Sequence, residues 1–118
     1  MENEKTSQEK EEAYASLINS LRYFHGEDMQ PLKESTFSLY KDVIMYRYGI
    51  FGSEGNTFKQ IGDILGKTPG RIQKIEAAII RKFSSHTMRK LVHALPDGEL
   101  KRSILTGEKP KRRESNEK

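Results

Sequence analysis

The feature that most limits how this chain can fold is a pair of helical patterns separated by a glycine, within the sequence TFKQIGDILGKTPGRIQKIEAAIIRKF at positions 57–83. In the first pattern, apolar or small residues recur at the spacing of one helical face: Phe58, Ile61, Gly62 and Leu65. Thr57 is placed to cap this helix through its hydroxyl, and Gly66 is placed to end it with a positive φ. A short helix over 58–65 is therefore predicted.

Gly62 stands inside that short helix, where glycine costs about 1 kcal/mol relative to alanine. A compensating contact is expected, because a residue without a Cβ lets another segment of backbone approach closely. We expect the second helix to make this close approach.

The second helix has its own start signals and two unlike faces. Thr68 suits the N-cap, and Pro69 suits the first helical position, where no amide hydrogen is needed. Large apolar residues form one stripe: Ile72, Ile75, Ile79 and Phe83. Small and donor-bearing residues occupy the opposite face and its edges: Gly70, Arg71, Gln73, Lys74, Ala77 and Arg81. A short helix, a glycine turn and a capped basic helix predict a helix-turn-helix, whose second helix can enter the major groove of DNA. The simpler alternative is a helical hairpin with a solvated basic face.

Positive charge is concentrated on and after this second helix. Between Lys67 and His93 there are seven lysines and arginines and one acid, Glu76, so the stretch carries +6 against +4 for the whole chain. The first twelve residues carry −3. A positive patch gains affinity for DNA by releasing counterions. The charge distribution therefore favours a nucleic-acid partner.

Composition argues against several other classes of protein. The chain has no cysteine, which excludes a disulfide framework and a cysteine-ligated zinc site. It has no apolar run of membrane-spanning length and no signal-peptide pattern, so we expect a soluble, cytoplasmic protein without a membrane partner. His25, His86 and His93 are too scattered for a metal site, and no cofactor is expected. We expect no enzymatic activity, because no nucleophile and base, and no carboxylate pair, occur in a pocket-forming context.

The chain divides into three predicted parts, all helical where they are ordered. Residues 1–34 hold an N-terminal helix, about 11–24, and a linker. Residues 35–95 form a small all-α domain with helices near 37–48, 58–65, 69–83 and 87–95. Residues 96–118 are predicted to be a disordered tail with too few apolar residues to add to a core. Its basic cluster is a DNA-seeking arm or an ordinary solubilising tail: Lys109, Lys111, Arg112 and Arg113.

Three segments of this domain carry a resemblance to a known family. They are VIMYRYGI at 43–50, TFKQIGDILGKT at 57–68 and RIQKIEAAIIRKF at 71–83. Over about residues 37–95 the chain resembles region 4 of bacterial sigma-70 family transcription initiation factors. The resemblance includes an arginine-aromatic-glycine triplet at Arg47, Tyr48 and Gly49. It implies a helix-turn-helix that reads the −35 promoter element with its second helix and docks on the flap of the RNA polymerase β subunit.

Together with the charge pattern, the resemblance implies a set of DNA-contacting residues: Thr57, Lys67, Thr68, Pro69, Gly70, Arg71, Gln73, Lys74 and Arg81. The chain departs from the family at four of them. Pro69 and Gly70 stand where the family typically has arginine and glutamate, and Gln73 and Lys74 stand where it has arginine and glutamine. Either the protein reads another sequence through Gln73 and Lys74, or it binds DNA weakly and without sequence preference.

Three functions are compatible with this pattern. A complete sigma factor also needs a region that melts promoter DNA, for which 118 residues leave no room. The chain is then a stand-alone DNA-binding transcription regulator, one half of a split sigma factor, or a protein-interaction module that binds RNA polymerase or a sigma factor with little DNA contact. The +6 stretch favours the first two functions, and the Pro69-Gly70 pair favours the third.

Overall fold

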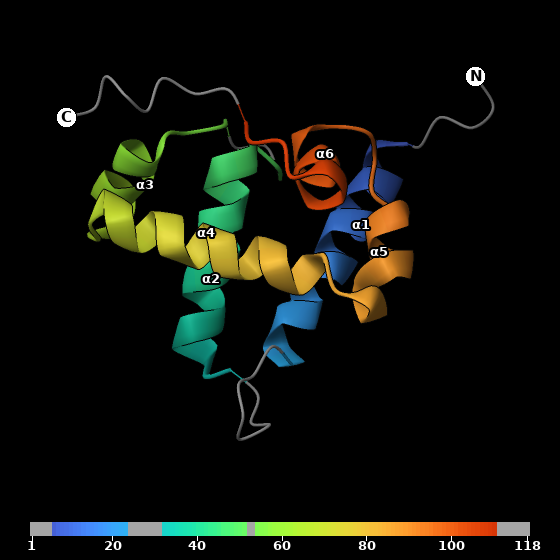
Figure 1. The fold of residues 1–118 in the computed structure, drawn as a ribbon, viewed down its shortest axis with the longest axis horizontal. Coiled ribbons are helices and arrows are strands. Elements are labelled where there is room, and N and C mark those ends of the chain that lie inside the picture. Colours follow the sequence, from blue (N-terminus) through green and yellow to red (C-terminus); the bar gives the residue numbers. More distant parts are fainter. Residues whose placement is uncertain (1–5, 24–31, 52–53, 111–118) are drawn as a thin grey trace.

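The computed structural model describes residues 6–23, 32–51 and 54–110, and every regular element in these ranges is a helix. The elements are α1 (Ser7–Asn19) with a 3-10 turn at Ser20–Tyr23, α2 (Glu34–Tyr48), α3 (Phe58–Leu65), α4 (Pro69–Phe83), a 3-10 turn at His86–Met88, α5 (Arg89–His93) and α6 (Glu99–Thr106). Figure 1 shows α4 crossing α2, with α3 at the N-terminal end of α4 and with α1, α5 and α6 gathered toward its other end. The predicted all-α class is confirmed.

The bounds of α3 and α4 agree with the sequence signals. The Thr57 hydroxyl accepts a hydrogen bond from the Gln60 amide at 3.1 Å, and the Gln60 side chain accepts one from the Thr57 amide at 2.8 Å. Gly66 ends α3 with φ at 70°. The Thr68 hydroxyl then accepts from the Arg71 amide at 3.1 Å and caps α4. Both predicted helices, 58–65 and 69–83, are confirmed with these caps.

The space left by Gly62 is filled by the turn between α3 and α4 and not chiefly by α4 itself. A Cβ at Gly62 would overlap the carbonyl oxygen of Lys67 and would lie 3.4 Å from the nitrogen of Pro69. The Gly62 carbonyl in turn accepts a hydrogen bond from the Lys67 amide at 2.9 Å. A close approach to Gly62 therefore exists, but the turn makes it and not the second helix as expected; it lets three residues turn the chain from one helix into the next.

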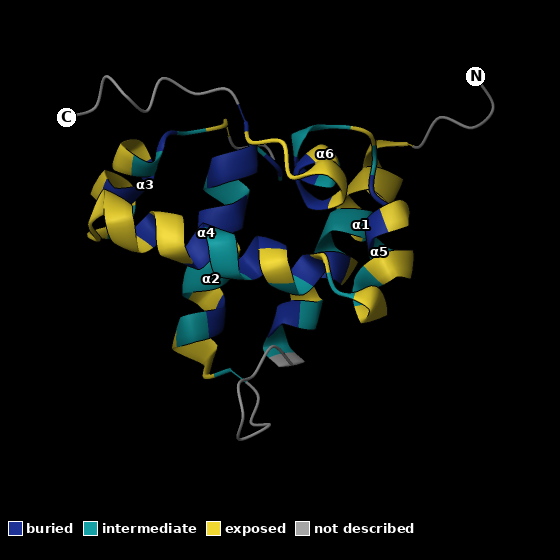
Figure 2. Cartoon of the chain, in the orientation of Figure 1, coloured by how far each residue is buried: buried dark blue, intermediate teal, exposed yellow. Residues whose placement is uncertain are grey.

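One hydrophobic core takes residues from all six α-helices. Its most deeply buried members include Leu17, Ile18, Leu21, Val43, Ile44, Ile61, Ile72, Ile79, Phe83, Leu95 and Leu100. Figure 2 shows these buried positions on the inward sides of the helices and the exposed positions on their outward sides. The predicted boundary after residue 34 is consequently no structural division, since Leu17 and Leu21 are completely buried in the same core as α2 and α4. Helix α1 also begins earlier than predicted, because Thr6 and Glu9 form a capping box.

The prediction of a disordered tail over 96–118 is wrong for residues 99–106, which form α6. Leu100 and Ile104 lie one turn apart on one face of this helix and are buried in the core. Three apolar residues in an otherwise polar segment, only two of them on one face, are too weak a pattern to predict a helix, and packing against α4 and α5 supplies what the local sequence lacks. Residues 107–110 follow α6 and are called the C-terminal strap below. Residues 111–118 lie outside the described ranges.

The two glycines of this region make a matched pair for testing the turn. Gly62→Ala should lower the free energy of unfolding by about 1–3 kcal/mol, because the added methyl group overlaps backbone that cannot move independently. Gly70→Ala should leave it unchanged or raise it by up to about 1 kcal/mol, because nothing lies within 4 Å of the new Cβ. Urea denaturation followed by circular dichroism measures both. Equal stability of the two variants would contradict the tight turn.

Candidate nucleic-acid interface

All but one of the residues predicted to contact DNA are exposed and lie together. They occupy the turn before α4 and the outward side of α4: Lys67, Thr68, Pro69, Gly70, Arg71, Gln73, Lys74 and Arg81. We call this surface the α4 outer face. Gly70, Lys74 and Arg81 are aligned along its middle at helical spacing, and Figure 2 shows exposed residues along the N-terminal half of α4. The structure therefore brings these residues into one continuous surface.

Thr57 is the exception among the predicted contact residues. Its exposed fraction is only 7%, and its hydroxyl accepts the Gln60 amide as the cap of α3. The structure gives Thr57 a role in starting α3, which holds the turn and hence α4 in place. It does not lie on the α4 outer face.

The α4 outer face carries cations, and the described stretch from Lys67 to His93 exposes no acidic side chain beside them. Glu76 is the one acid between Lys67 and His93, and its exposed fraction is 1% because its side chain points into the molecule. On the neighbouring helix α3, the exposed Asp63 carboxylate forms an ion pair with Lys59 at 3.3 Å. The N-terminal end of α4 adds the partial positive charge of its helix dipole. This combination of fixed cations and a helix N-terminus attracts phosphate groups.

The first two residues of α4 have no long side chain. Pro69 and Gly70 are both exposed, and there is open space around the position of a Cβ at Gly70. Gln73 and Lys74, one turn later, are the first long polar side chains on the helix after Arg71. A glutamine amide can bond both polar atoms of an adenine edge, and a lysine can bond a guanine edge or a phosphate. The shape of this face thus permits a partner to approach the helix backbone closely at Pro69 and Gly70. The donors of Gln73 and Lys74 lie one turn further along the helix.

The inward side of α4 contains a buried polar cluster that the sequence analysis missed. The Tyr48 hydroxyl, at the end of α2, donates a hydrogen bond to the Glu76 carboxyl group, and Lys109 Nζ lies 3.7 Å from Glu76 Oε1. Burial and the neighbouring Glu76 carboxyl group raise the pKa of Tyr48 well above the ordinary value for tyrosine. Glu76 lies four residues after Ile72 and therefore on the apolar stripe of α4. This position could have indicated from the sequence that Glu76 is buried.

The Arg47-Tyr48-Gly49 triplet has a structural role in this molecule. The buried Arg47 guanidinium donates a hydrogen bond to the Asn56 carbonyl at 3.0 Å and lies 3.9 Å from the centre of the Phe58 ring. Gly49 ends α2 with φ at 67°. Arg47 thus contacts the start of α3, and Tyr48 contacts Glu76 in the middle of α4. Together these contacts fix the position of α3 and α4 relative to α2.

Other kinds of site are not supported by the described part of the chain. Within 6–23, 32–51 and 54–110, no three histidine or acidic side chains come together as metal ligands would. In the same ranges, no helix combines the length and apolar character needed to span a bilayer. His25, one of the three scattered histidines, lies outside the described residues.

Alkaline titration should reveal the buried Tyr48 phenol. Its pKa is raised in the folded state, so above pH about 10 the unfolded chain loses this proton first. Stability should then fall by up to about 1.4 kcal/mol per pH unit from this group alone. Tyr48→Phe should remove that part of the slope and, at neutral pH, cost about 1–3 kcal/mol because Glu76 loses its donor. Tyr14→Phe is the comparison: burial alone raises the pKa of Tyr14, so this change should remove a smaller part of the slope. Urea denaturation between pH 7 and 11 measures this. An alkaline slope that survives Tyr48→Phe unchanged would contradict the assignment.

Comparison of the chain with protein-family models, with curated proteins and with solved structures found no match.

Proposed function

We propose that this protein is a DNA-binding transcription regulator, in which α3, the following turn and α4 act as a helix-turn-helix of the kind found in sigma region 4. One observation carries the proposal: the α4 outer face is exposed and cationic, and the only acid of the surrounding stretch is turned inward. The close fit of the turn at Gly62 supports it, because a reading helix must be held rigidly against the helix that precedes it.

In this proposal the cations and the polar residues of the α4 outer face have different tasks. On DNA of any sequence, phosphates are neutralised and counterions released by Lys67, Arg71, Lys74 and Arg81, which supplies affinity without sequence preference. Gln73 and Lys74 face base edges in the major groove and supply discrimination, at about 1–3 kcal/mol for each good bidentate contact. Because Pro69 and Gly70 have no side chain that can read a base, we expect a target sequence different from the −35 element of sigma factors.

Charge-neutral replacement on the α4 outer face tests this proposal. Binding of the unaltered protein to duplex DNA should weaken roughly 500-fold between about 50 and 200 mM salt if about five phosphates are neutralised. Arg71→Gln combined with Lys74→Gln should lower the salt slope by about 2 and reduce affinity at every salt concentration. Fluorescence anisotropy with a randomised duplex pool measures both quantities.

The matched control removes the same charge from elsewhere on the surface. Lys33 and Lys41 are exposed on and just before α2, away from the α4 outer face. Lys33→Gln combined with Lys41→Gln should therefore leave binding nearly unchanged. The proposed interface is wrong if both double variants lose DNA affinity equally. It is also wrong if the DNA affinity of the unaltered protein does not depend on salt concentration.

A second candidate function is favoured by the Pro69-Gly70 pair. These residues leave the N-terminal end of α4, which would contact base edges, without the two long side chains that the sigma family typically has there. The protein would then act mainly by contacting the transcription machinery, either at the flap of the RNA polymerase β subunit or on a sigma factor. In this case DNA contact is secondary to the protein contact.

Recovery of polymerase from the native host separates the two candidates. Tagged protein should retain RNA polymerase after nuclease treatment if it binds the machinery directly, and should lose it if DNA bridges them. Under the second candidate, the Arg71→Gln and Lys74→Gln double variant should capture polymerase as well as the unaltered protein does. Loss of both RNA polymerase and sigma factors from the unaltered protein and from the double variant after nuclease treatment would exclude the second candidate.

A further inference from the structure

An open hollow lies at the C-terminal end of α4, where Figure 1 shows α5 and α6 beside this helix. Its volume is about 330 Å³, and three segments form it: the end of α4 with the turn that follows, the stretch 86–93 that contains α5, and the last turns of α6. None of the residues predicted to contact DNA lines it. The hollow is therefore a different surface from the α4 outer face.

The floor of this hollow is apolar. Phe83, Val92 and Ile104 line it with side chains that belong to the hydrophobic core. Leu105 stands at its border with an exposed fraction of 50%, and only Ile64 among the described residues is another large apolar side chain exposed to this extent. An apolar group placed in the hollow would cover this surface and gain the free energy of removing it from water.

The border of the hollow formed by the stretch 86–93 carries nitrogen donors. His86, Arg89 and His93 recur at helical spacing, and all three are exposed and line the hollow. No ion pair joins them to an acid within the described part of the chain, and no acidic residue lines the hollow. An arginine guanidinium presents donors only, in a fork that matches a carboxylate. This border therefore offers an unoccupied place for an anion.

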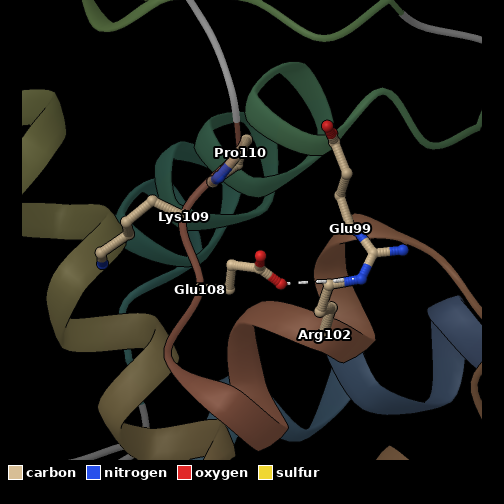
Figure 3. Close-up of a pocket in the computed structure, with 5 residues that line it drawn as sticks. All are labelled: Glu99, Arg102, Glu108, Lys109 and Pro110. Carbon is tan, nitrogen blue, oxygen red and sulfur yellow. Dashed lines mark ion pairs between the residues drawn. The ribbon is translucent and has the colours of Figure 1, made fainter.

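A second hollow, between α6 and the C-terminal strap, shows what an occupied arginine looks like in this molecule. Figure 3 shows Arg102 and Glu108 facing each other there, and the Glu108 carboxylate lies 3.9 Å from Arg102 Nε. Glu99 also borders that hollow. Because its arginine already has an acid of the same chain beside it, the second hollow is a poor site for an added anion.

The end of α4 opposes an anion in the first hollow, but only in part. A helix C-terminus carries about half an elementary charge of negative sign. Ser84 reduces this effect, since its hydroxyl donates to the Ile80 carbonyl at 2.8 Å and its amide donates to the same carbonyl at 2.9 Å. The full positive charge of Arg89 is larger than what remains. The balance of charge at the border is consequently positive.

We propose that this hollow binds a small organic acid whose apolar group rests on Phe83, Val92 and Ile104 and whose carboxylate pairs with Arg89. Ligand pockets in proteins have volumes of about 300–1,000 Å³, so this hollow suits a ligand of about one ring or one branched chain. His86 and His93 flank the carboxylate as further donors. The inference does not depend on the proposed function, because no residue of the α4 outer face takes part.

The test titrates the full chain with phenylacetate and follows the backbone amide signals by ¹H–¹⁵N NMR. Two control ligands each lack one half of the proposed chemistry: phenylacetamide has the ring without the charge, and acetate has the charge without the ring. Phenylacetate should give saturable shifts that are centred on residues 83–105. Both control ligands should bind about tenfold more weakly or less, because each loses either a charge-assisted hydrogen bond or the apolar contact.

Variants of exposed residues assign the two halves of the site. Arg89→Gln should weaken phenylacetate binding about tenfold or more, and Leu105→Ser should weaken it severalfold. Lys90→Gln is the matched control, since Lys90 is exposed next to Arg89 and does not line the hollow. The unfolding midpoints of Arg89→Gln and Lys90→Gln should equal that of the unaltered protein.

Three outcomes would overturn the proposal. These are shifts that do not saturate or that lie outside residues 83–105, equal affinity for phenylacetate and phenylacetamide, and equal weakening by Arg89→Gln and Lys90→Gln. None of them affects the DNA interface on α4, which is tested separately through Arg71→Gln and Lys74→Gln.

Discussion

The hydrogen bond between the Tyr48 hydroxyl and the buried Glu76 carboxyl group is the interaction on which the placement of α4 depends. A buried carboxyl group without partners is costly, so Glu76 can lie inside only when its donors are in position. The donor comes from the end of α2, and Lys109 of the C-terminal strap adds an ion-pair partner 3.7 Å away. The orientation of α4 is thereby tied to elements that lie before and after it in the chain.

This inward anchor has a direct electrostatic consequence for the outward side of α4. An exposed Glu76 would offset part of the charge that Lys74 and Arg81 place on the helix surface. Turned inward, it instead lies 3.7 Å from Lys109 of the C-terminal strap. The acid is thereby kept off the α4 outer face. This arrangement supports the proposal of a polyanionic partner.

The sequence was most informative where structure is set by neighbouring residues. The bounds of α3 and α4 follow from caps at Thr57 and Thr68, from the glycine at Gly66 and from one clear apolar stripe, all of which act within a few residues. The exposure of Arg71, Gln73 and Lys74 also follows, because a helix with one apolar stripe must turn its opposite face outward. Most of the candidate interface could therefore be predicted without coordinates.

The sequence by itself determined an all-α chain, a tight glycine turn and a basic helix face, because periodicity, capping and backbone freedom are local properties. Only the tertiary structure decided that Glu76 points inward and that residues 99–106 form a helix. Both depend on contacts between segments far apart in the chain: Tyr48 with Glu76, Lys109 with Glu76, and Leu100 with the core. The residues next to a single acid on an apolar stripe, or next to a few apolar residues in a short polar segment, do not specify its conformation; such distant partners do.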